Sequence, residues 1–77
     1  MRRRKLPALS SDQVRRALVR AGFLVHRIKG SHHHLRHPSR PGARSVVPMH
    51  RGDLPAGTLR AIIKQAGLSL DEFLDLL

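Results

Sequence analysis

The stretch GSHHHLRHP, residues 30–38, lies between two segments with strand character and sets the topology of the chain. The residues before it, FLVHRIK (23–29), include β-branched and aromatic side chains in partial alternation, which predicts a strand. Gly30 and Ser31 interrupt this pattern, and residues 33–37 are numerous enough to return beside the first strand as a hairpin. A third strand is predicted at residues 44–47, ended by Pro48. We therefore expect a three-stranded antiparallel meander.

Alternation along these strands assigns their side chains to two faces of the sheet. In the first strand we expect one face to carry Leu24, His26 and Ile28 and the other to carry Phe23, Val25, Arg27 and Lys29. In the second strand, if Leu35 points to the helices, His33 and His37 share its face, and His34 and Arg36 lie opposite.

Helical patterns flank the meander on both sides. The first helix has a Ser10–Gln13 capping box, apolar residues at i, i+3, i+4 and i+7 from Val14, and Gly22 beyond its end. The same spacing from Leu59 predicts a second helix that begins between residues 55 and 58 and ends at residue 67. A further capping box at Ser69 opens a short last helix.

These elements predict an α+β fold, a small α-β-β-β-α domain. Two helices cover one face of the sheet, and a short C-terminal helix follows. The chain has 77 residues, enough for a single small domain, which we place at residues 10–77. Residues 1–9 form a basic N-terminal lead without an apolar period, as in a mobile arm.

Charge is the strongest compositional signal, because the net charge is +10. Residues 1–52 carry thirteen Lys or Arg and one acid, whereas residues 53–77 have a net charge of −2. A polyanionic partner, and nucleic acid first, is therefore expected. With two Phe and no Trp or Tyr, base stacking is limited, so phosphate contacts should dominate binding.

The absence of cysteine, of a membrane-spanning run and of a signal-peptide core predicts a cytoplasmic protein without a membrane partner.

The histidine cluster at residues 32–34 and 37 is the candidate chemical site. Histidine exchanges protons near neutral pH, so a cluster indicates acid/base catalysis or metal binding. A metal site would use His32 and His34, with His50 as a third ligand, but cysteine is absent and carboxylates are scarce nearby. His37 and His50 also fit structural hydrogen bonding near turns. A cloning tag is the trivial alternative, but tags lie at chain ends.

The order of elements and the motif at residues 30–38 resemble the HicA family of toxin ribonucleases. The shared positions follow the family's order from residue 22 onward: Gly22-Phe23, Arg27, Gly30-Ser31-His32-His33, Arg36-His37-Pro38, Val47-Pro48, His50, residues 54–60 and residues 64–69. The resemblance implies a fold like that of a double-stranded-RNA-binding domain and cleavage of mRNA without a metal or cofactor. It also implies neutralisation by a HicB-type antitoxin.

The family's catalytic histidine stands in a Gly-Ser-x-His motif, which carries over to His33. His34 stands at a position where the family commonly has a neutral polar residue. The roles of His34, His37 and His50 therefore stay open. Supporting or RNA-binding roles are expected for Gly30, Ser31, His32, Arg27, Lys29, Arg36, Arg60 and Lys64. Gly30 would let the backbone approach a phosphate, or would simply form the turn. The competing hypothesis is an RNA-binding module of the same fold without catalysis.

Overall fold

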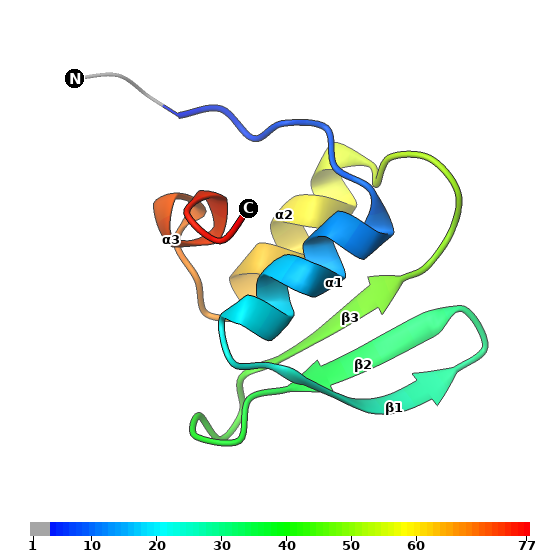
Figure 1. Ribbon diagram of the computed structural model, residues 1–77, viewed down its shortest axis with the longest axis vertical. Coiled ribbons are helices and arrows are strands. Elements are labelled where there is room, and N and C mark those ends of the chain that lie inside the picture. Colours follow the sequence, from blue (N-terminus) through cyan, green and yellow to red (C-terminus); the bar gives the residue numbers. More distant parts are fainter. Residues whose placement is uncertain (1–3) are drawn as a thin grey trace.

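The computed structural model describes residues 4–77 and confirms the α+β architecture (Figure 1). In chain order the elements are α1 (Ser11–Arg20), β1 (Leu24–Lys29), β2 (His32–Arg36), β3 (Arg44–Pro48), α2 (Ala56–Gln65) and α3 (Leu70–Leu74). The sheet is an antiparallel meander in the order β1-β2-β3. Figure 1 shows α1 and α2 side by side on one face of the sheet, with α3 beyond their ends.

The core lies between this pair of helices and the β2–β3 part of the sheet. Leu35 of β2 and Val47 of β3 are fully buried, as are Leu18 of α1 and Phe23, which connects α1 to β1. Both helices contact β3. By contrast, every residue of β1 is exposed. The helices therefore cover one face of β2 and β3 and leave β1 as an uncovered edge strand.

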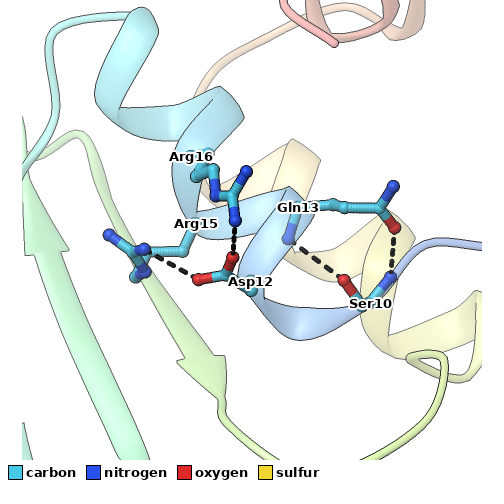
Figure 2. A network of polar contacts seen from close by, with 5 residues as sticks. All are labelled: Ser10, Asp12, Gln13, Arg15 and Arg16. Atoms are coloured by element: carbon cyan, nitrogen blue, oxygen red, sulfur yellow. Dashed lines mark hydrogen bonds and ion pairs between the residues drawn. The ribbon is translucent and has the colours of Figure 1, made fainter.

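The ends of the helices form the local motifs that the sequence predicts. The hydroxyl of Ser10 accepts from the Gln13 backbone N–H at 3.2 Å, and the Ser10 N–H donates to the Gln13 side chain at 2.9 Å (Figure 2). At the other end of α1, Gly22 has φ 100°, and the N–H groups of Gly22 and Phe23 donate to Val19 and Leu18. This Schellman motif satisfies carbonyls that the helix leaves free and turns the chain into β1. Gly67 ends α2 in the same way.

A bulge in β1 makes the face assignment of that strand wrong. Val25 pairs with Leu35 and Arg27 pairs with His34, so His26 is an extra residue with no partner in the register. Beyond the bulge the alternation is reversed. Val25 and Ile28 therefore share the face that the helices cover, whereas Leu24, Arg27 and Lys29 share the open face.

The remaining strand and helix boundaries shift by one or two residues from the expected ones. β2 spans His32–Arg36 instead of residues 33–37, because the Lys29–His32 pair closes a turn of only two residues. β3 extends to Pro48, which lies opposite His32. Phe23 precedes β1 instead of opening it, and α2 ends at Gln65, two residues before Gly67. The start of α2 at Ala56 lies within the expected range.

The described part of the basic lead contacts the domain. Leu9 is buried, Leu6 packs against the core, and the Leu54 N–H donates to the Leu9 carbonyl at 2.8 Å. Arg4 forms an ion pair with Asp75 at 2.7 Å. The first three residues of the predicted lead lie outside the described residues. No helix in residues 4–77 is long and apolar enough to span a membrane.

Candidate active site and basic surfaces

A two-residue turn, Gly30 and Ser31, joins β1 to β2 at one end of the sheet. Gly30 has φ 57°, whereas no residue other than glycine has a positive φ in the described chain. Glycine at the first central position is the pattern of a type II′ hairpin turn. A Cβ at Gly30 would meet no atom within 4 Å, so the backbone conformation, and not space, requires glycine here.

Hydrogen bonds tie this turn to the segment that follows β3 and to the start of α1. The Met49 N–H donates to the Ser31 carbonyl at 2.6 Å. The buried hydroxyl of Ser11 donates to the Pro48 carbonyl at 2.7 Å and accepts from the His50 N–H at 3.3 Å. Three segments that are distant in sequence therefore meet at one fixed corner of the domain.

His33 lies one residue into β2, beside this corner. It pairs with Ile28 on β1 and with Val47 on β3, so its side chain points to the face that the helices cover. The residue is half-buried, and its Nδ1 atom is buried without a hydrogen-bond partner in the described chain. A buried polar atom without a partner costs about 1–3 kcal/mol, and such atoms call for a specific explanation.

His37, by contrast, uses both ring nitrogens within the chain. The Ser39 N–H donates to Nδ1 at 3.1 Å, so the ring proton is on Nε2, which donates to the Ala21 carbonyl at 3.1 Å. The ring also packs edge-on against Phe23 with centroids 5.2 Å apart. These contacts confirm the structural hydrogen bonding expected of His37.

His50 lies in the loop after β3 and is exposed. Its Nδ1 is 2.9 Å from the Arg51 carbonyl and donates to it, because a carbonyl can only accept. His50 therefore also makes a hydrogen bond near a turn, and its backbone N–H helps to fix the corner beside His33.

The structure separates the other predicted supporting residues from His33. Arg27, Lys29, His32, His34 and Arg36 all lie on the open face of the sheet, as their cross-strand partners show. His32 and His34 thus share a face, as expected. Arg44, absent from the sequence-based candidates, joins them because it pairs with Arg36. The alternation of residues 44–47 could have indicated it, since buried Ser45 and Val47 place Arg44 on the opposite face.

Arg60 and Lys64 project from α2, and both are exposed. They line a hollow of about 760 Å³ together with Arg4 and Lys5, over an apolar floor that includes Ile63. The lining of this hollow does not include His33 or any residue of the sheet. The structure therefore does not bring these two residues together with the other candidates.

Four of the five carboxylates take part in ion pairs or caps, and Asp53 forms no ion pair within residues 4–77. Asp12 binds Arg15 at 2.7 Å and Arg16 at 2.6 Å, and Figure 2 shows its carboxylate between the two guanidinium groups. The hydrogen bond from Arg15, aided by Arg16, lowers the pKa of Asp12. Hydrogen bonds from the Ser69 backbone and hydroxyl lower the pKa of Glu72. The hydrogen bond to Asp75 raises the pKa of Arg4.

The three strands and their connections carry no Asp or Glu, so every charged side chain on the open face of the sheet is basic. Within residues 4–77, no three His, Asp or Glu side chains are grouped closely enough to hold a metal ion. The arrangement is that of a half-buried histidine beside a hydrogen-bonded corner of a basic domain, which suits proton transfer to or from a phosphate ester.

Comparison with known proteins identifies the family. No curated protein matches the chain at the level of similarity that we required. The family model described as the HicA toxin of bacterial toxin–antitoxin systems matches residues 11–68, from the start of α1 to just beyond α2. This match covers most of the chain and all three strands, and it supports a toxin role with an antitoxin partner. The chain belongs to the HicA toxin family of bacterial toxin–antitoxin systems.

Proposed function

We propose that this protein is a toxin endoribonuclease that cleaves mRNA without a metal, uses His33 for proton transfer, and is neutralised by a HicB-type antitoxin. The observation that carries the proposal is the state of His33 in its Gly-Ser-x-His motif. Its ring is half-buried and leaves a buried nitrogen without a partner, whereas His37, four residues on, is fully hydrogen-bonded. An imidazole with free hydrogen-bonding capacity in a strongly basic domain supports a chemical role.

The proposed reaction needs only groups that RNA and this chain supply. A base removes the proton from a ribose 2′-OH, and the 2′ oxygen forms a bond to the adjacent phosphorus. The bond from phosphorus to the 5′ oxygen breaks, and that oxygen takes up a proton. The products are a 2′,3′-cyclic phosphate and a 5′-hydroxyl. His33 would transfer one of these protons, and nearby cations would stabilise the added negative charge in the transition state.

The fixed corner around His33 favours catalysis over binding alone. The bonds from Met49 to Ser31 and from Ser11 to Pro48 and His50 hold the turn, the loop and the start of α1 together. A catalytic group must be held within a fraction of an ångström of its working position, which such a network provides. A module that only holds RNA backbone does not need this arrangement around a histidine.

The proposed antitoxin contact follows from charge and from the surface beside His33. A chain with a net charge of +10 is best matched by an acidic partner. Ile28, which pairs with His33, is 60% exposed, and Val25, which pairs with Leu35, is 39% exposed. Both lie on the same face of the sheet as His33, but at β1, which the helices do not cover. Apolar side chains beside the proposed catalytic residue suit a partner that covers this residue.

Cleavage of defined RNA by the wild-type protein and by His33→Ala tests the proposal. We expect His33→Ala to lower the cleavage rate by roughly 10²–10⁴-fold, the usual contribution of one acid/base group. The circular dichroism spectrum should be unchanged, because the ring makes no hydrogen bond within residues 4–77 through its buried nitrogen. A chelator should not affect the rate, and the products should carry the termini named above.

Three results would contradict the proposal: cleavage by His33→Ala at the wild-type rate, reversible loss of cleavage on chelation, and RNA binding without any cleavage by the wild-type protein. The last result would favour the RNA-binding module.

Arg60 and Lys64 remain candidates for phosphate contacts. Exchange of both residues for Glu should weaken RNA binding without unfolding the protein, because both side chains are exposed.

A further inference from the structure

The open face of the sheet carries a continuous band of basic side chains, which we call the cationic stripe. Its members form three pairs of directly opposed residues: Lys29 with His32, Arg27 with His34, and Arg36 with Arg44. The pairs follow β2 from its first residue to its last, a length of about 14 Å at 3.4 Å per residue. One side of the domain is therefore lined with positive or protonatable groups at every level of the strand.

The stripe has no electrostatic partner within the strands or their connections. These segments contain no Asp or Glu. The nearest acids in sequence are Asp53, five residues after β3, and Asp12, which is engaged by Arg15 and Arg16 on α1. Like charges placed directly opposite each other destabilise a sheet by a few tenths of a kcal/mol or more per pair. The Arg36–Arg44 pair is such a case, and a bound anionic group would relieve its repulsion.

A hollow at one end of the stripe adds shape to this charge. It has a volume of about 440 Å³, and its lining includes His26, His34, Arg36 and Arg44. His26 is the extra residue of the β1 bulge, and it adds a third histidine to the open face beside His32 and His34. Bulges commonly redirect side chains next to functional sites.

The other end of the stripe leads to the proposed catalytic residue. Lys29 and His32 close the turn formed by Gly30 and Ser31, and His33 follows directly, on the other face of the sheet. An RNA strand lying along the stripe would reach His33 by passing around this turn. Because both residues of the turn are small, its surface presents little obstruction.

We propose that the cationic stripe binds the sugar-phosphate backbone of the RNA that flanks the cleaved bond, on the face of the sheet opposite to His33. The proposal rests on the proposed ribonuclease function and adds the path of the substrate. RNA suits the stripe better than an acidic protein does, because its cations follow β2 over the whole length of the strand, as a phosphate backbone would require. Two of the three exposed apolar side chains of β1, Val25 and Ile28, lie on the other face of the sheet. The contacts are to phosphates and are independent of base sequence.

Binding of an oligonucleotide that cannot be cut tests the stripe separately from catalysis. A fully 2′-O-methylated RNA lacks the nucleophile, and its affinity can be measured by fluorescence anisotropy over a range of salt concentrations. The double variant Arg36→Gln with Arg44→Gln should weaken binding about 5- to 30-fold at low salt. It should also lower the slope of log affinity against log salt by about 1.4, because each lost phosphate contact removes about 0.7.

A matched control removes the same charge elsewhere. Arg15→Gln with Arg16→Gln also removes two positive charges, but both of these arginines already pair with Asp12 on α1. We expect it to change the affinity much less than the stripe variant does. Equal losses from the two variants would mean that net charge, and not the stripe, determines binding, and the proposal would be overturned. An unchanged affinity of the stripe variant would also overturn it.

Substrate length gives a second readout. Binding energy from remote parts of a substrate raises the rate at the reacting bond, so a long RNA should be cut faster than a dinucleotide with the same bond. The stripe variant should lose most of this advantage, so the ratio of its rates on long RNA and on the dinucleotide should be several-fold smaller than in the wild type. If the advantage of length survives in the stripe variant, the proposed path is wrong.

Two further results separate the neighbouring hypotheses. Failure of the wild-type protein to cut any RNA would contradict the ribonuclease function but would leave the binding measurement valid. Poly-glutamate serves as the acidic-protein probe. We expect poly-glutamate to bind less tightly than the modified RNA. If it does bind as tightly, and if the stripe variant loses poly-glutamate binding to the same extent as RNA binding, the surface recognises acidic protein and the proposed path of the RNA is refuted.

Discussion

Val47 of β3 lies directly opposite His33 of β2, so the imidazole of His33 shares the covered face of the sheet with a fully buried valine. His32 and His34, on either side of His33, point to the opposite, open face. Three adjacent histidines therefore belong to two different environments. Only the middle one combines partial burial with a buried nitrogen that lacks a partner among residues 4–77.

This separation predicts different effects for alanine at the three positions. His33→Ala should remove most cleavage, whereas His32→Ala and His34→Ala should each reduce it by less than about tenfold, because one surface contact contributes at most about 1 kcal/mol. Cleavage rates at saturating RNA would measure the chemical step, and rates at low RNA would include binding. A comparably severe loss in all three variants would indicate a shared metal cluster and would contradict a single acid/base residue.

The sequence predicts the parts of this fold that depend on local rules. Ser10 and Ser69 begin helices because their hydroxyls and the side chains three residues later satisfy free N–H groups, and both boxes are visible in the sequence. The turn at Gly30 and the assignment of His33 to the covered face also follow from local pattern and alternation. The family resemblance rests on motifs spread from Gly22 to Ser69, and the family model confirms it over residues 11–68.

The sequence could not reveal features that depend on contacts between distant segments. Nothing in residues 24–29 marks His26 as the extra residue of a bulge, and without the bulge every later residue of β1 is assigned to the wrong face. The cationic stripe could not be predicted from the sequence, because it depends on the pairing of Arg27 with His34 beyond the bulge. The hydrogen bonds of His37 to Ala21 and Ser39 were equally invisible, since they depend on how the β2–β3 connection packs against the end of α1.

His37 should matter for stability and not for the chemical step. His37→Ala removes the donor to the Ala21 carbonyl and the edge contact with Phe23, so the free energy of unfolding should fall by about 1–3 kcal/mol. Urea denaturation measures this change. His50→Ala is the control, because its exposed ring bonds only the adjacent Arg51 carbonyl, and its effect should stay within about 0.5 kcal/mol. A loss of cleavage in fully folded His37→Ala would show that His37 takes part in the reaction.

Alanine at two glycines should have opposite effects on stability. A Cβ would meet no atom within 4 Å at either Gly30 or Gly57, so steric contact does not distinguish them. Gly30 has φ 57°, and alanine there should cost about 1–2 kcal/mol because the left-handed conformation is unfavourable for L-residues. Gly57 lies in α2, where alanine should add up to about 1 kcal/mol. Thermal unfolding of both variants tests this contrast, and stabilisation by Gly30→Ala would show that the turn has another conformation.

The domain should lose stability in acid through two carboxylates. The pKa of Asp12 is lowered by Arg15 and then by Arg16, and that of Glu72 by the Ser69 backbone and hydroxyl. Because each pKa is lower in the folded than in the unfolded chain, the folded state binds fewer protons. The stabilisation is therefore complete above the unfolded values near pH 4 and disappears as the pH falls through the folded values.

The double variant Asp12→Asn with Glu72→Gln should therefore be less stable than the wild type at pH 7 and nearly as stable at low pH. Urea denaturation between pH 2 and pH 7 would show that the free energy of unfolding falls less steeply with decreasing pH in this variant than in the wild type. Asp53→Asn, outside both networks, controls for the removal of a negative charge from a strongly basic chain and should retain the wild-type slope. High salt should reduce the contribution of Asp12, because exposed ion pairs are screened, and should affect the Ser69–Glu72 capping box less. If the free energy of unfolding falls equally steeply with decreasing pH in the double variant and in the wild type, Asp12 and Glu72 are not the source of the acid sensitivity.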